Sequence, residues 1–106
     1  MNLIHDLIRQ NRKATREEIK LLVKHYVASD FTDSILNLLK DSELLRLAAI
    51  GIFSHFEAKQ LQRSLTMKKI GAILQVSESS IRKWFPPDEK PFVLLIKSVK
   101  NHGKGA

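Results

Sequence analysis

Apolar residues recur along this chain at every third or fourth position, the spacing that places them on one face of an α-helix. A first helix is predicted near residues 3–8 and ends close to the polar run at residues 10–13. A second helix is predicted to start at Thr15, because Thr15 and Glu18 have the spacing of a capping box. No segment alternates with the period of two that a half-buried β-strand shows, so the pattern predicts an all-α fold. The apolar positions of the two helices are Leu3, Ile4, Leu7 and Ile8, then Ile19, Leu22, Val23, Tyr26 and Val27.

The middle of the chain predicts a short helix followed by a long one. The short helix follows a break at residues 30–33 (DFTD) and closes at residues 40–41. Ser42 is expected to cap the long helix, which continues to Arg63 and is apolar around nearly its whole circumference, so it must be covered on all sides. Either a second copy of the chain supplies part of the cover in a homodimer, or the helix is the core helix of a monomeric bundle. The apolar positions are Phe31, Ile35, Leu38 and Leu39 in the short helix and Leu44, Leu45, Leu47, Ala48, Ile50, Ile52, Phe53 and Phe56 in the long one.

Residues 66–85, TMKKIGAILQVSESSIRKWF, have the pattern of a helix-turn-helix. Two helices, residues 67–74 and 77–85, are predicted to be joined by a turn at Gln75 and Val76. Gly71 removes a side chain where the second helix must cross closely. Gln75 departs from the pattern, since this turn often has glycine at a positive φ, where glutamine has a steric cost. The residues expected to face the core are Ile70, Ile73, Leu74, Ile81, Trp84 and Phe85, with Val76 filling the angle of the turn.

A helix-breaking, proline-containing segment follows the helix-turn-helix. Prolines in residues 86–91 (PPDEKP) lack an amide donor and clash with the preceding turn, so the helix cannot continue. Pro91 suits the first position of a closing helix. The sequence thus predicts a single domain of about six helices: residues 1–64 form the core and dimerisation helices, residues 66–85 the helix-turn-helix, residues 91–100 the closing helix and residues 101–106 a loose tail.

Composition narrows the class of protein. The 106 residues suit one domain, and the absence of cysteine excludes a disulfide framework and a thiolate metal site and suits the reducing cytoplasm. The longest nearly uninterrupted apolar run, residues 47–53, is far shorter than the roughly 20 residues of a membrane-spanning helix, so no membrane partner is predicted. Apolar residues precede the basic ones at the N-terminus, which is the wrong order for a secretory signal.

Positive charge is concentrated in the second part of the chain. Residues 1–65 carry 10 Lys and Arg against 8 Asp and Glu, a net charge of +2, whereas residues 66–106 carry 8 against 3, a net charge of +5. A basic segment is expected where phosphates are neutralised, which favours double-stranded DNA as the partner. A solvated basic surface is the alternative interpretation.

The outward face of the second helix carries the predicted base contacts. Arg82 is the candidate for a bidentate contact with guanine, because its forked guanidinium matches the two acceptors of that base edge. Glu78 either accepts a hydrogen bond from cytosine or stabilises the helix N-terminus by its negative charge. Ser77 is expected to cap this helix, whose free amides attract a phosphate. The remaining predicted contacts, to phosphate, sugar or a base edge, are Ser79, Ser80 and Lys83 on this helix and Lys68 and Lys69 on the preceding one.

Over residues 15–100 the order of these segments resembles the Trp repressor family. The short helix with its polar cap (SILNLLKDSELL), the helix-turn-helix (LTMKKIGAILQVSESSIRKW) and the proline-started helix (PFVLLIKSV) carry the resemblance. It implies an intertwined helical homodimer whose two reading heads face successive major grooves. That family's tryptophan site uses an arginine on the central helix and an Arg-Gly-Ser run on the recognition helix, whereas Phe53 and residues 83–85 (KWF) stand at those places here. Tryptophan is therefore not predicted as a corepressor, and no other effector is identified.

The sequence thus predicts a cytoplasmic, sequence-specific DNA-binding transcription regulator that acts as a dimer and needs no cofactor. The alternative is a phage or plasmid accessory module that uses the helix-turn-helix shape to bind a polymerase or replication protein. Stacking of Trp84 and Phe85 on bases is a weaker interpretation than core packing, because their spacing with Ile81 is that of one buried helix face. Catalysis is not expected: no phosphate loop or Ser/His/Asp set is present, and metal-ligand spacing is absent from the histidines, which are His5, His25, His55 and His102.

Overall fold

The computed structural model describes residues 3–104, with side chains described through residue 99. Within these residues the chain forms seven helices and no strand, which confirms the all-α prediction. None of the helices in this part of the chain is both long and apolar enough to cross a membrane. The helices are α1 (Leu3–Gln10), α2 (Arg16–Tyr26), α3 (Asp33–Leu36), α4 (Asp41–Glu57), α5 (Arg63–Leu74), α6 (Glu78–Trp84) and α7 (Pro91–Lys104).

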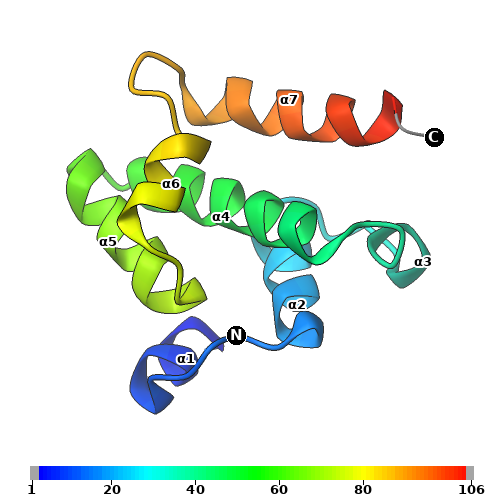
Figure 1. Ribbon diagram of the computed structural model, residues 1–106, viewed down its shortest axis with the longest axis horizontal. Coiled ribbons are helices and arrows are strands. Elements are labelled where there is room, and N and C mark those ends of the chain that lie inside the picture. The colour runs from blue at the N-terminus through cyan, green and yellow to red at the C-terminus, as the bar shows by residue number, and fades with distance from the viewer. Residues whose placement is uncertain (1–2, 105–106) are drawn as a thin grey trace.

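The long helix α4 lies at the centre of the molecule, with α2, α5 and α7 packed against it (Figure 1). Helix α6 packs on α5, and α1 packs on α5 from another side. The chain's own helices therefore cover α4, so its burial does not require a second copy of the chain. The buried residues of α4 are Leu44, Leu47, Ala48, Ala49, Ile50, Gly51, Ile52 and Phe53.

Both predicted ends of the long helix are wrong. It begins at Asp41 rather than at a Ser42 cap, because the Glu43 carboxylate accepts from the backbone N–H of Lys40 at 2.8 Å and makes Lys40 the N-cap. It ends at Glu57 rather than at Arg63, since the chain turns through Gln60, whose φ is 62°. The first helix of the helix-turn-helix consequently starts at Arg63, four residues before the predicted Met67.

The short helix α3 is four residues long, and its inward face differs from the predicted one. Thr32 caps it by accepting from the backbone N–H of Ile35 at 3.3 Å. Leu36 and Leu39 are buried, whereas Ile35 is exposed and Leu38 is 74% exposed. One helical turn buries one face only, so the four apolar residues of this segment cannot all reach the core.

The closing helix starts at Pro91 as predicted but continues to Lys104, so the end predicted at residue 100 is wrong. Of the predicted loose tail, residues 101–104 are helical and residues 105–106 lie outside the described residues. The helix continues through Gly103. A single glycine in a helix costs about 1 kcal/mol relative to alanine, which need not end the helix by itself.

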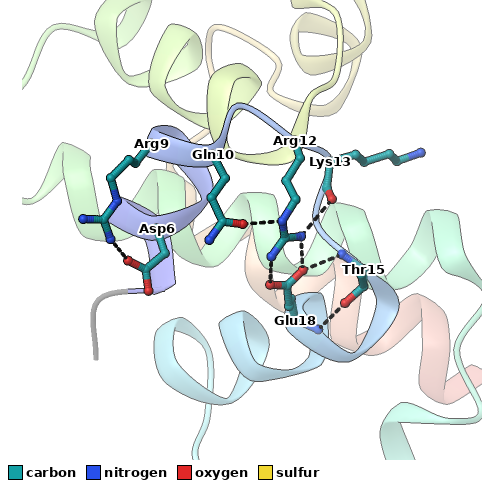
Figure 2. A network of polar contacts seen from close by, with 7 residues as sticks. All are labelled: Asp6, Arg9, Gln10, Arg12, Lys13, Thr15 and Glu18. Carbon is teal, nitrogen blue, oxygen red and sulfur yellow. Dashed lines mark hydrogen bonds and ion pairs between the residues drawn. The ribbon is translucent and has the colours of Figure 1, made fainter.

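The start of α2 is held by the polar network in Figure 2. The backbone N–H of Glu18 donates to Thr15 Oγ1 at 3.3 Å, and the backbone N–H of Thr15 donates to Glu18 Oε1 at 2.9 Å, so the predicted capping box is confirmed. Arg12 adds a two-pronged ion pair, with Nη1 and Nη2 at 2.7 and 2.6 Å from the two Glu18 oxygens. These contacts hold the pKa of Glu18 at about 2, the Arg12 hydrogen bond first and the Thr15 amide second.

Replacing Glu18 with alanine should lower the free energy of unfolding at pH 7 by about 1 kcal/mol, because half of the capping box and the Arg12 pair are lost. A folded-state pKa below the ordinary 4.5 means that this stabilisation is fully present above pH 4.5 and is lost as the pH falls toward 2. Urea unfolding from pH 7 to pH 2 measures both effects. The variant should lose less stability below pH 4.5 than the wild type, whereas Asp88→Asn, at an exposed position of the loop before α7, should follow the wild type. An equal acid loss in the Glu18 variant would contradict the assignment.

Candidate nucleic-acid interface

The turn between α5 and α6 has the geometry that the sequence pattern requires. Gln75 adopts the left-handed conformation, with φ 56° and ψ 46°, and its backbone N–H donates to the carbonyl of Gly71. A Cβ added to Gly71 would lie 3.1 Å from the Val76 carbonyl oxygen and 3.3 Å from Ile81 Cδ1. The close crossing predicted at Gly71 and the positive φ suspected at Gln75 are both confirmed. Glutamine occupies this conformation despite its steric cost.

The two helices are locked together through their apolar faces. Phe85 is 1% exposed and stacks on Phe53 of α4, with ring centroids 4.4 Å apart and ring planes at 18°. Trp84 and Val76 are partly buried against the same core. Core packing is therefore confirmed for Phe85, which leaves no ring face free for a base. The fully buried apolar residues of the two helices are Ile70, Ile73 and Leu74 on α5 and Ile81 on α6.

The opposite face of α6 is polar and accessible. Ser77 caps the helix by accepting from the backbone N–H of Ser80 at 3.3 Å, as predicted. The Arg82 side chain is 69% exposed and lies 3.7 Å from the Glu78 carboxylate, an i,i+4 ion pair on the helix surface. Exposed pairs of this kind are weak, so both side chains remain free to exchange partners. The predicted outward residues Glu78, Ser79, Arg82 and Lys83 are all exposed, and Ser80 is half-buried.

Of the two lysines predicted to contact DNA from α5, only Lys68 lies on the side of α5 that adjoins the polar face of α6. Lys68 is exposed and lies one helical turn after Ser64, which lines a hollow together with Glu78 and Arg82. Lys69 lies about 100° further around the helix. Its Nζ sits 5.6 Å from the centre of the Phe56 ring of α4, on the flank that α4 covers. The structure thus brings Lys68 to the candidate interface and directs Lys69 away from it.

Arg63 is a positioning residue that the sequence interpretation missed. Its Nη2 donates to the backbone carbonyls of Phe85 at 3.1 Å and Pro86 at 2.9 Å, which fixes the end of α6 to the start of α5. The guanidinium also lies 4.9 Å from the centre of the Phe53 ring, a cation–π contact. No local pattern could reveal this role, because the two carbonyls lie 22 and 23 residues further along the chain.

The linker between α1 and α2 borders the turn of the helix-turn-helix. Gln75 Nε2 donates to Asn11 Oδ1 at 3.4 Å, across 64 residues of sequence. Arg12, in the same linker, is bound to Glu18, whereas Lys13 is exposed and its side chain points away from the network in Figure 2. This linker was not predicted to lie near the candidate interface, since no sequence signal relates it to Gln75.

The histidines of the described residues are not arranged as a metal site: across residues 3–99 no group of three His, Cys, Asp or Glu side chains is close enough to hold a metal ion. His25, Tyr26 and His55 form edge-on ring contacts where α2 meets α4, with centroids 4.6 and 5.0 Å apart. Burial lowers the pKa of His55, and the charges of Lys59 and His25 lower it further. This cluster lies on α2 and α4, outside the helix-turn-helix.

Comparisons of this chain with protein-family models, with curated proteins and with solved structures gave no match. The class of protein therefore rests on the geometry of the chain itself, which is that of a helical domain with an exposed helix-turn-helix.

Proposed function

We propose that this protein is a sequence-specific double-stranded DNA-binding transcription regulator that reads the major groove with α6. One observation carries the proposal: the apolar face of α6 is locked to α5 around Gly71, so the polar face bearing Arg82 is held outward in a fixed orientation. A rigidly mounted, exposed, hydrogen-bonding helix is what major-groove readout needs. The net charge of +5 on residues 66–106 adds the attraction to phosphates.

The residues of this face have separate roles in the proposed complex. Arg82 leaves its weak pair with Glu78 to contact guanine, and Glu78 then accepts from a neighbouring cytosine. The serines at the start of α6 and Lys83 contact phosphate or sugar, and Lys68 contacts the DNA backbone from α5. Lys69 is the weakest member of the predicted set, because it faces Phe56.

The proposed regulator acts in the cytoplasm as a dimer on a two-fold symmetric site and does not depend on tryptophan. At the places where the Trp repressor resemblance puts the corepressor site, Phe53 and Phe85 are buried and stacked on one another. Two aromatic rings in contact leave no room between them for an indole, which supports ligand-independent binding.

Replacing Arg82 with alanine should weaken binding to the preferred duplex by about 10- to 100-fold, since a bidentate guanine contact is worth about 1–3 kcal/mol. The duplex is first selected from a random pool, and the affinities are then measured by fluorescence anisotropy. Thermal unfolding should be unchanged, because the side chain is 69% exposed. Lys69→Ala removes one positive charge from the neighbouring helix and should change the affinity at most about 3-fold.

Raising the salt concentration should weaken wild-type binding steeply, in proportion to the number of phosphates contacted. The Arg82 variant should lose preference among sequences as well as affinity. Equal effects of the Arg82 and Lys69 substitutions would mean that only overall charge matters and that α6 is not the reading helix. Failure to select any duplex would reject DNA binding and favour a protein partner for this face.

A further inference from the structure

The surface formed by α3 and α7 exposes large apolar side chains that the proposed function does not use. On α7, Phe92, Ile96 and Val99 follow at i, i+4 and i+7 and so share one side of the helix. Val99 and Ile35 line the same groove, which joins the α7 residues to α3. We call this surface the α3–α7 patch; its members are Ile35, Leu38, Phe92, Val93, Ile96 and Val99, with exposures from 37% to 74%.

The patch is large for a monomeric protein. A fully exposed large apolar side chain presents roughly 150–250 Å², so these six residues present on the order of 600 Å². The largest contiguous apolar patch on a typical monomer is about 300–600 Å², so this patch lies at the upper end of that range. Two such patches facing one another would bury on the order of 1,200 Å², which reaches the lower limit of a stable protein–protein interface.

The shape of the patch is complementary to itself. At one end, the groove between α3, α4 and α7 encloses about 140 Å³. Its lining is mainly apolar and includes Phe31, Leu39 and Val99, together with Glu43, Arg46 and Ser98. Cavities of about 150 Å³ accept a benzene ring, so this groove suits a phenyl group. At the other end Phe92 stands 69% exposed. One surface therefore carries both an aromatic ridge and a groove of matching size.

We infer that a second copy of this chain docks on the α3–α7 patch, with the two α7 helices crossing antiparallel around a two-fold axis near Ile96. Phe92 and Val99 are seven residues apart, or ~10 Å along a helix, and Ile96 lies near their midpoint. Antiparallel crossing then brings Phe92 of each copy to the groove beside Val99 of the other. Each contact occurs twice, as a two-fold interface requires.

The charge of the patch members does not oppose a second copy on this surface. The chain carries a net charge of +7, so two copies repel one another at most orientations. The patch members are all uncharged, and none of the reading residues of α6 belongs to the patch. Docking here leaves Arg82 exposed on both copies. The inference specifies the dimer of the proposed function but does not need DNA.

Sedimentation velocity without DNA tests the inference. The wild type should dimerise with a dissociation constant on the order of micromolar, and Phe92→Asp should raise that constant at least about 100-fold, because both copies lose the aromatic anchor that fills the other's groove. Leu65→Asp, at an exposed leucine of α5 outside the patch, should keep the wild-type constant. Circular dichroism should report the same helix content for all three, since both side chains are exposed.

A cross-linking experiment tests the position of the two-fold axis. The chain has no cysteine, so Ile96→Cys and Leu65→Cys each introduce a single thiol. Ile96→Cys should form an inter-chain disulfide at micromolar protein, because residues near the axis come within the Cα separation of roughly 4–7 Å that a disulfide needs. Leu65→Cys should remain at least about ten times less cross-linked.

Three results would overturn the inference: a wild-type chain that is monomeric at about 100 μM, a Phe92→Asp variant that dimerises like the wild type, or equal cross-linking of the two cysteine variants. Failure of the dimer inference can be distinguished from failure of the proposed DNA-binding function. A dimer that binds no duplex would leave the inference standing and reject the proposed function. A monomer that binds a selected half-site through Arg82 would do the reverse.

Discussion

Replacing Gly51 with leucine should lower the free energy of unfolding by about 3 kcal/mol, the upper end of the range for overpacked cores. Gly51 is buried in α4 where α2 crosses it. A Cβ at this position would lie 2.7 Å from Val27 Cγ2, 3.1 Å from Tyr26 Cβ and 3.2 Å from the Tyr26 carbonyl carbon. The first neighbour is a stiff β-branched side chain and the third is backbone, so the two helices must move apart.

Urea unfolding followed by circular dichroism measures this effect. Ala72→Leu introduces the same leucine side chain at an exposed position of α5 and should change stability by less than about 0.5 kcal/mol. Because none of the proposed reading residues lies on α2 or α4, the folded Gly51 variant should bind the selected duplex as the wild type does. A wild-type urea midpoint for Gly51→Leu would show that α2 does not approach α4 this closely.

The features that were predicted correctly from the sequence depend on neighbours within a few residues. Thr15 and Ser77 cap their helices through amides three residues later, and these hydroxyls can be recognised in the sequence. The positive φ at Gln75 was indicated by its place between two helical patterns, although glutamine rarely adopts it. Local spacing was also sufficient to assign the buried and exposed faces of α6.

The features that were missed depend on tertiary contacts. After the end of α4 there is no proline or glycine between Ala58 and Gln62, so the sequence pattern of a helix continues past residue 57. The break at Gln60 is set by how α5 packs back on α4. Contacts across more than 20 residues give Arg63 its role at the end of α6. The sequence does not distinguish Lys68 from Lys69 as candidate DNA contacts. In the structure Lys69 lies against Phe56, on the side of α5 that faces away from the candidate interface.

Replacing Phe85 with alanine should lower the free energy of unfolding by about 3–5 kcal/mol, the largest single loss expected in this chain. Phe85 is almost completely buried, and the substitution removes its stack with Phe53 and leaves a cavity between α4 and the end of α6. Urea unfolding measures the loss. Leu65→Ala, at an exposed apolar residue of α5, should cost less than about 0.5 kcal/mol.

The Phe85 variant also distinguishes two contributions to DNA binding by α6: the packing that holds the helix in place and the contacts that its exposed face makes with DNA. An apolar cavity beside Phe53 should take up benzene, as cavities of this kind do, and saturating benzene should recover part of the lost stability. If α6 reads DNA only when its buried face is held, benzene should restore duplex affinity together with stability. Arg82→Ala should respond to benzene in neither property, since it changes the exposed face alone. Recovery of stability without recovery of affinity would mean that Phe85 sets the orientation of α6 by its own ring rather than by filling space.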